Sequence, residues 1–328
     1  MCSMITQVSG GALEESYEAS KGQIPQEMVV HRVISPSSKR EGAYESDDRL
    51  ERIDIFLPIG PKDSLFAPFL FRSLELFTPC YGDLVVLIEP QSISMLFSVI
   101  PLYAYVFVVG EPLPPQFGYL TQQFLKMYAD VFTSNDYVLI LETDLVQSSS
   151  AVREGYFDEQ GKIMSNCRMF GDVKWCGENC DIWKVGTEHA LGVPMDRDCL
   201  MKSPFLYPRE IFGRVRNHIE NHLGKPLIHI MEDYFAGHSK GWEVTDTLFS
   251  ELNILNMYGR LYMPEEFNFI TIDRHGIDSH ICFRHVGSQV RRNYDIWNPK
   301  ATEQYFELAQ KYVYEEACRR DPTSRGCG

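Results

Sequence analysis

The stretch DYVLILETDLVQ, residues 136–147, decides the fold. Its aliphatic residues pass directly into Glu142, Thr143 and Asp144, and polar residues follow. A continuous apolar run of this length is typical of a strand that is buried on both faces. Carboxylates at its end can share a ligand if the chain turns there, and their oxygens suit hard divalent ions that also bind phosphate. The stretch therefore indicates either a metal–diphosphate site or a solvated strand end with two acids.

Three similar apolar runs precede this one, at residues 53–59, 83–89 and 104–112. The segments between them have helical spacing, beginning near Ser64, near Ser92 and at Phe117. Alternation of buried strands and helices predicts an α/β fold, with a mostly parallel sheet flanked by helices on both faces. Ligands of such sheets bind at the carboxyl ends of the strands. Residues 58–63, Glu89 and the acidic motif are therefore the positions of interest.

The remaining chain is less regular. Residues 1–50 lack a periodic apolar pattern and are expected to be a disordered arm. We expect one domain at 51–320, with a nucleotide-binding half at 51–150, an irregular α+β acceptor half at 151–320, and a tail at 321–328. The elements expected in the second half are a hairpin at 156–163, helices at 209–223, 232–238, 248–257 and 302–319, and strands at 267–272 and 281–285.

Composition narrows the classes of partner. The 328 residues include 31 Lys and Arg against 45 Asp and Glu, so the net charge is 31 − 45 = −14. This charge argues against nucleic acid or an anionic membrane as the main partner. A small phosphorylated ligand remains compatible, because a metal ion and a few local cations can hold it.

Residues 90–110 carry no charge over a length that could span a bilayer. Pro101 and the strand-forming run after it instead favour a helix end, a turn and a buried strand. We therefore expect no integral membrane segment. The amino-terminal residues lack the basic and apolar regions of a secretory signal, which favours a cytoplasmic or otherwise soluble intracellular protein.

Nine cysteines occur, an odd number, and most are interpreted as reduced thiols. Cys176 and Cys180, in CGENC, could close a small disulfide or help to hold zinc.

The order of the strands, the acidic motif after the fourth strand and the total length resemble the GT-A fold nucleotide-sugar glycosyltransferases. The chain also resembles an uncharacterised, mainly bacterial family of GT-A-like proteins, in this motif, in SPFLYPREI at 203–211 and in FSELNILNMYG at 249–259. The likeness covers about residues 51–290. It implies a GT-A-like (Rossmann-like) fold, a nucleotide-sugar donor with UDP or GDP, a glycan or other hydroxyl acceptor, and Mn²⁺ or Mg²⁺ as cofactor.

This resemblance implies a role for each matching residue. Asp144 would ligate the metal ion. Glu142, which stands where Asp is the commoner residue, would touch the ribose or a metal-bound water, or ligate the metal. A downstream histidine often completes such a metal site, and His285 matches it better than His280.

The donor would contact residues from both halves of the chain. Pro58 and Ile59 would line the base pocket, and Glu89 would face the base or ribose. Arg284 and Arg291 could neutralise the leaving diphosphate, because guanidinium groups pair well with phosphate; a basic surface loop is the alternative.

Transfer with inversion needs a group that takes the acceptor proton. Glu251, in FSELN, is the first candidate and Asp233, in MEDYF, the second. A first-turn carboxylate such as Glu251 can also serve only the helix dipole.

Two alternatives to a transferase remain open: a non-catalytic GT-A-like protein that binds a sugar or a partner, and a sugar nucleotidyltransferase. The sequence lacks the G-x-G-x-x-G, G-x-x-x-x-G-K-[ST] and G-x-S-x-G motifs. Dinucleotide-dependent enzymes, P-loop kinases and α/β-hydrolases are therefore disfavoured.

Overall fold

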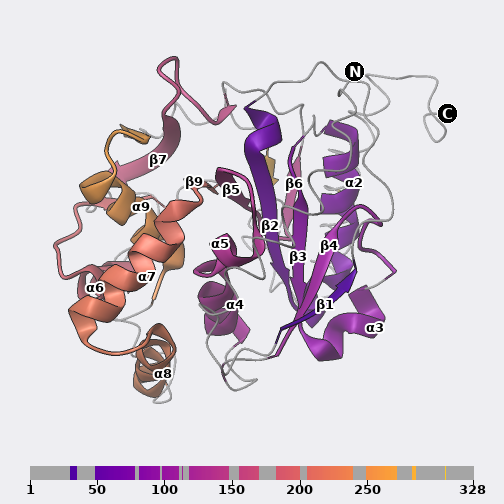
Figure 1. Cartoon of the computed structure of the whole chain (residues 1–328), viewed down its shortest axis with the longest axis horizontal. Coiled ribbons are helices and arrows are strands. Elements are labelled where there is room, and N and C mark those ends of the chain that lie inside the picture. Colours follow the sequence, from indigo (N-terminus) through magenta and orange to yellow (C-terminus); the bar gives the residue numbers. More distant parts are fainter. Residues whose placement is uncertain are drawn as a thin grey trace.

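The structure, a computed structural model, describes residues 30–34, 49–77, 81–96, 98–110, 113, 118–147, 155–169, 182–199, 205–238, 249–271, 283–285 and 307. Its centre is a six-stranded sheet with the order β1-β4-β3-β2-β5-β9 (Figure 1). The strands are β1 (Val30–Ile34), β2 (Ile53–Ile59), β3 (Leu84–Ile88), β4 (Tyr105–Val109), β5 (Tyr137–Ile140) and β9 (Phe205–Pro208).

The four inner strands of this sheet run parallel, and the two edge strands run antiparallel to their neighbours. Every residue of β2, β3 and β4 is buried, as the continuous apolar runs require of strands that helices cover on both faces. The mostly parallel sheet flanked by helices, predicted from the sequence, is therefore confirmed.

Helices of the first half cover both faces of the sheet (Figure 1). The chain moves outward from β2 to β3 and β4, and then returns to add β5 on the other side of β2. Because such connections are right-handed, α2 and α3 lie on one face, and α4 and α5 on the other. These helices are α2 (Ala67–Phe77), α3 (Ile93–Leu96), α4 (Gly118–Lys126) and α5 (Ala129–Phe132), with short 3₁₀ turns η2 (Leu50–Arg52), η3 (Pro61–Leu65) and η4 (Pro90–Ser92).

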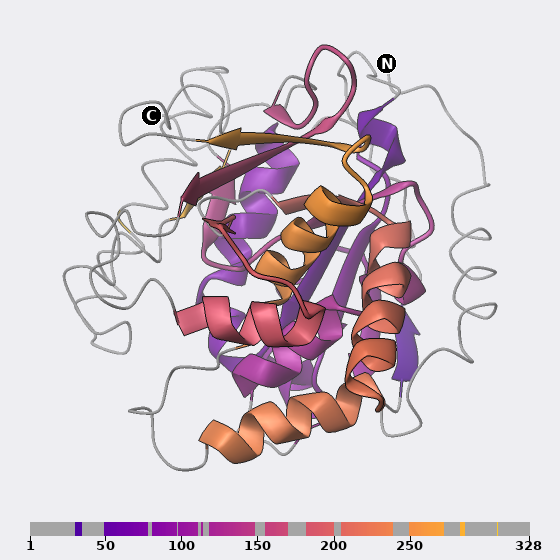
Figure 2. The same ribbon diagram turned by 90° about the vertical axis from the view of Figure 1, so that its left-hand side faces the viewer.

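The second half adds a helical layer and two small sheets (Figure 2). Its helices are α6 (Ile182–Leu191), α7 (Glu210–Leu223), α8 (Leu227–His238) and α9 (Glu251–Tyr262). A three-stranded sheet has the order β10-β7-β8, and β11 pairs with β6. These strands are β6 (Leu145–Gln147), β7 (Ile163–Met169), β8 (Arg197–Asp198), β10 (Phe267–Thr271) and β11 (Phe283–His285).

Several boundaries differ from those predicted. The fourth strand ends at Ile140, so the acidic motif lies in a turn between β5 and β6. Ser64 does not start a helix: it lies within η3, and α2 begins at Ala67. Residues 30–34, expected to be part of the disordered arm, form edge strand β1 against β4. Most of the expected helix at 302–319 lies outside the described residues.

The uncharged segment 90–110 contains η4, α3 and the buried strand β4. Among the described residues, no helix has the length and apolar character needed to cross a membrane.

The described residues include a disulfide that the sequence did not predict. Cys167, in β7, and Cys199, directly after β8, form it. Their 32-residue separation gave no signal of the pairing, because the fold alone brings the two strands together. Cys176 and Cys180 lie outside the described residues.

Candidate functional site

The acidic turn, Glu142 to Asp144, lies at the carboxyl end of β5, beside the carboxyl end of β2. The chain leaves these two neighbouring strands in opposite directions. Within this sheet β2 is followed by β3 on one side, and β5 is followed by β9 on the other. Ligands of open α/β sheets bind at such a switch point. The turn predicted from the sequence to carry chemistry therefore occupies the position where this type of sheet opens a site.

One buried cation joins the two halves of the chain here. Lys126, the last residue of α4, has its Nζ 3.2 Å from Oε1 of Glu142 and 3.0 Å from Oε1 of Glu251. The side chains of Lys126 and Glu251 are 3% and 4% exposed, and that of Glu142 is 31% exposed. We call these three residues the Lys126 cluster. It connects the acidic turn to the first residue of α9.

The charges of this cluster depend on one another. Burial alone would lower the pKa of Lys126, but the adjacent carboxylates of Glu251 and Glu142 outweigh burial and raise the pKa of its ammonium group. Lys126 therefore stays protonated at neutral pH. One positive charge faces two carboxylates, so the cluster keeps an excess of negative charge that a bound cation could neutralise.

A second contact ties the acidic turn to β2. The hydroxyl of Thr143 donates a hydrogen bond of 2.6 Å to Oδ1 of Asp63, and the amide of Gly60 donates one of 2.8 Å to Oδ2. Burial raises the pKa of Asp63, although these two hydrogen bonds act in the opposite direction. Asp63 lies in η3, the turn that follows β2, so it fixes the middle of the acidic turn across the switch point.

Helix α9 brings Glu251 to the cluster. Ser250 is its N-cap, and the Ser250 hydroxyl accepts a 3.3 Å hydrogen bond from the amide of Asn253. Glu251 is the first helical residue, where the dipole favours a carboxylate, and its side chain turns to Lys126. Glu251, predicted from the sequence to take the acceptor proton, shares Lys126 with Glu142 of the acidic turn. The side chain of Glu251 is buried, however, and its carboxylate faces the lysine rather than solvent.

Strand β11 approaches the turn from far along the chain. Its antiparallel pairing with β6 puts His285 opposite Leu145 and Arg284 opposite Val146. His285 is therefore one ladder position from Asp144, the residue with which it was predicted to share a metal. The structure describes the backbone of β11 and not its side chains. Arg291 lies outside the described residues.

The other predicted residues divide into two groups. Pro58 and Ile59 are buried at the carboxyl end of β2, and Glu89 follows β3, at the same edge of the sheet as the turn. Asp233, in contrast, is on α8 with a 65% exposed side chain that pairs with Lys225. Asp233 is therefore not one of the carboxylates gathered around Lys126.

The donors at the turn suit Mn²⁺ or Mg²⁺. Carboxylate oxygens come from Glu142 and Asp144, and the backbone register adds a histidine position, a donor set that Mn²⁺ accepts. Within the part of the chain that the structure describes, no three His, Cys, Asp or Glu side chains already form a metal-binding group. For an ion held by these two carboxylates, water and a ligand would have to supply the remaining oxygens.

Lys126 was not among the site residues predicted from the sequence. The one available signal was a lysine inside the run FLKMY, residues 124–128, whose other members are all buried. A lysine in such a run must be paired, because an unpaired buried charge is strongly unfavourable. Its partners could not be named from the sequence, since they are 16 and 125 residues away.

Comparisons with known proteins gave structural likeness only. No protein-family model matches the sequence, and no curated protein sequence matches it. The galactosyltransferase LgtC, solved with donor and acceptor sugar analogues, aligns with 79% of this chain and 95% of its own, at 12% identity and a TM-score of 0.43. Two structures of the glycosyltransferase GlyE of Streptococcus pneumoniae TIGR4 align with 81% of this chain at 11% identity, with TM-scores of 0.33 and 0.36. The alignment spans 63% of the GlyE chains.

Proposed function

We propose that this protein is a metal-dependent glycosyltransferase that moves a sugar from a nucleotide-sugar donor to a hydroxyl group. The observation that carries the proposal is the Lys126 cluster, in which a buried lysine joins the acidic turn at the switch point to the start of α9. The site offers carboxylate oxygens for a divalent ion, a fixed positive charge, and a location at the carboxyl edge of parallel strands.

The residues of the site divide the work of holding a diphosphate. Asp144 and the partly exposed Glu142 would hold Mn²⁺ or Mg²⁺, with His285 as a further ligand. When bound, the ion stabilises the negative charge of the departing diphosphate. Lys126 keeps Glu142 in place and offsets part of the negative charge of the turn, while Asp63 holds Thr143 and hence the turn itself.

Glu251 has a different role in this proposal from that of general base. A base must contact the acceptor hydroxyl, and the side chain of Glu251 is 4% exposed and directed to Lys126. We assign it as a positioning residue. Glu251→Gln should lower turnover and leave the shape of the pH–rate profile unchanged; loss of the acidic limb of that profile would instead identify Glu251 as the base.

The test is a thermal-shift measurement with UDP, GDP, CDP and TDP, each with Mn²⁺ or with EDTA. A ligand at a hundred times its Kd adds about 2.7 kcal/mol to the unfolding free energy and raises Tm by about 4 °C for a chain of this size. We expect one nucleoside diphosphate to stabilise the protein with Mn²⁺, and Asp144→Asn to abolish the effect. Glu210→Gln is the matched control, because it removes one charge from an exposed helix pair on α7.

The sugar donors of the nucleotide that binds are then assayed for release of the nucleoside diphosphate. Release that requires metal and Asp144 supports the proposal. Binding without release in the presence of varied hydroxyl acceptors indicates a sugar-binding protein, and pyrophosphate release from nucleoside triphosphates indicates a nucleotidyltransferase. Either result overturns the proposal, as does the absence of any thermal shift.

A further inference from the structure

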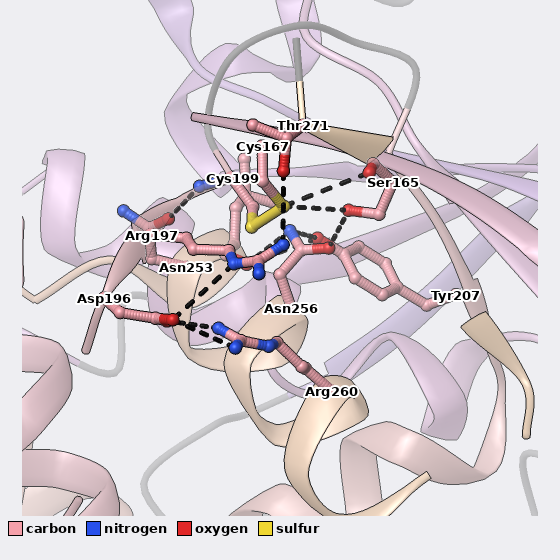
Figure 3. Close-up of a disulfide and its surroundings, with 11 residues drawn as sticks. Ser165, Cys167, Asp196, Arg197, Cys199, Tyr207, Asn253, Asn256, Arg260 and Thr271 are labelled. Carbon is pink, nitrogen blue, oxygen red and sulfur yellow. Dashed lines mark hydrogen bonds and ion pairs between the residues drawn. A yellow bond between two sulfur atoms is a disulfide. The ribbon is translucent and has the colours of Figure 1, made fainter. Parts of the chain in front are cut away.

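The disulfide between Cys167 and Cys199 lies directly beside α9 (Figure 3). Two asparagines of α9 face it from successive turns of the helix, as positions three residues apart do. The side-chain oxygen of Asn253 accepts a 3.0 Å hydrogen bond from the amide of Cys199, and that of Asn256 accepts one of 2.7 Å from Ser165. The segments on both sides of the disulfide are therefore tied to the same helix.

The contact with Cys199 is the more sensitive of the two. Strand β8, which leads into Cys199, has two residues and pairs with β7 only at Arg168–Asp198 and Met169–Arg197 in the described ladder. The disulfide is a covalent addition to this short ladder. Asn253 is completely buried, and among the described atoms its Nδ2 has no hydrogen-bond partner. Loss of the Cys199 contact would leave a buried amide group unsatisfied, which favours rearrangement of the first turn of α9.

That turn is also the one that carries Glu251. The backbone amide of Asn253 donates a hydrogen bond to the hydroxyl of the N-cap residue Ser250. Glu251 lies between these two residues in the sequence, and its Oε1 is 3.0 Å from Nζ of Lys126. A displacement of this turn would therefore move Glu251 and alter the Lys126 cluster.

We propose that the Cys167–Cys199 disulfide is a redox-sensitive positioning device: oxidised, it holds the first turn of α9 and Glu251 against Lys126, and reduced, it releases them. The importance of this device for turnover rests on the proposed function, whereas its effect on α9 does not. In the reduction, a dithiol attacks one sulfur to form a mixed disulfide, and its second thiol displaces that sulfur. The dithiol is oxidised to its disulfide, and Cys167 and Cys199 each gain an electron and a proton.

Both cysteines are buried, so attack requires the segment around Cys199 to open. Coupling between two sites acts in both directions. Weakening the Lys126–Glu251 pair should therefore raise the population of the open state, and hence the observed rate of reduction.

The experiment uses the full chain, with other thiols blocked by alkylation before dithiothreitol is added. Mass spectrometry follows the peptides that contain Cys167 and Cys199, and hydrogen exchange follows the amides of α9 and α7. We expect reduction to raise exchange in the first turns of α9 by about tenfold or more, to leave α7 unchanged, and to be reversed on reoxidation. Asn253→Ala should loosen the same turns with the disulfide intact, and Glu251→Gln should accelerate reduction relative to Glu210→Gln.

Alkylation of either cysteine before reduction would overturn the inference, as would unchanged exchange in α9 or an equal increase in α7, which would mark a general structural cross-link. Binding of a nucleoside diphosphate with Mn²⁺ is measured in both redox states. If α9 responds but neither state binds, the proposed function fails and the device stands. If binding is found in both states and α9 does not respond, the device fails and the proposed function stands.

Discussion

At the scale of single residues, Lys126 is the position on which most depends. A lysine that is 3% exposed would be strongly unfavourable without partners, and Glu251 would be equally unfavourable without the lysine. Removal of one partner of a buried ion pair typically costs more than the pair contributes, because a charge is left alone in a poorly solvated place. The cluster therefore constrains both halves of the chain at once.

Lys126→Met should lower the free energy of unfolding by about 3 kcal/mol, since it leaves Glu251 buried without its cation. The double variant Lys126→Met/Glu251→Gln should recover a large part of this loss, because the uncompensated charge is removed. Urea denaturation of the two single variants and the double variant measures the coupling. An unchanged free energy of unfolding in Lys126→Met would contradict the importance given to the pair.

At the scale of elements, α9 does the most to assemble the site. It contacts α4, α6, α7 and β10, and its two ends have separate anchors. The N-terminal turn holds Glu251, and near the other end Arg260 pairs with Asp196. Gly259 lets this end approach β10 closely, because a Cβ there would lie 2.6 Å from the ring of Phe267.

Gly259→Ala should destabilise the protein, although Ala favours a helix over Gly by about 1 kcal/mol. A clash with a rigid buried ring costs about 1–3 kcal/mol, so the clash is the larger effect. Gly213→Ala in α7 is the matched control, because its nearest atom, Oδ2 of Asp130, would be 3.3 Å away. Thermal unfolding should show a lower Tm for Gly259→Ala than for Gly213→Ala. Equal Tm values would show that Phe267 in β10 can move aside without a loss of stability.

At the scale of the whole molecule, the 14 excess negative charges repel an anionic nucleotide at long range. Groups within the site must therefore supply the attraction that binds it. The same charges set the response to acid. The hydrogen bond and charge of Arg260 lower the pKa of Asp196, whereas burial raises the pKa of Asp63. The two carboxylates therefore affect stability with opposite signs.

The pH dependence of unfolding should show both effects. Stability from Asp196 is present above its ordinary pKa of 3.8 and is lost as the pH falls through its lower folded-state pKa. Asp196→Asn should therefore flatten the acid side of the stability curve. For Asp63, stability is greatest below 3.8 and declines as the pH rises through its raised folded-state pKa, so Asp63→Asn should remove a decline above pH 4. Denaturant titrations between pH 2.5 and 7 test both; identical slopes in the variants and the parent protein would refute the assignments.

Much of the first half could be predicted because its information is local. Strands β3 and β4 are continuous apolar runs and β2 is one apart from Asp54, and each run is followed by residues that end it. The acidic residues after the fourth apolar run were predicted for the same reason. Their position in a turn between β5 and β6 was not predicted, because hydrophobicity alone does not mark where strand pairing stops. Strand β1 was missed, since His31 and Arg32 interrupt its apolar residues and leave no continuous apolar run in VHRVI.

The sequence by itself determined the class of fold, the parallel core and the acids at the carboxyl end of β5. These follow from the period of the hydrophobic pattern and from the polar residues that interrupt it. Only the tertiary structure decided that Lys126 joins Glu142 to Glu251, that Cys167 pairs with Cys199, that β11 lies beside β6, and that Asp233 points outward. These contacts join residues up to 140 positions apart or depend on which face of a helix is covered. Such information is absent from any local window, because it arises when the chain packs its elements together.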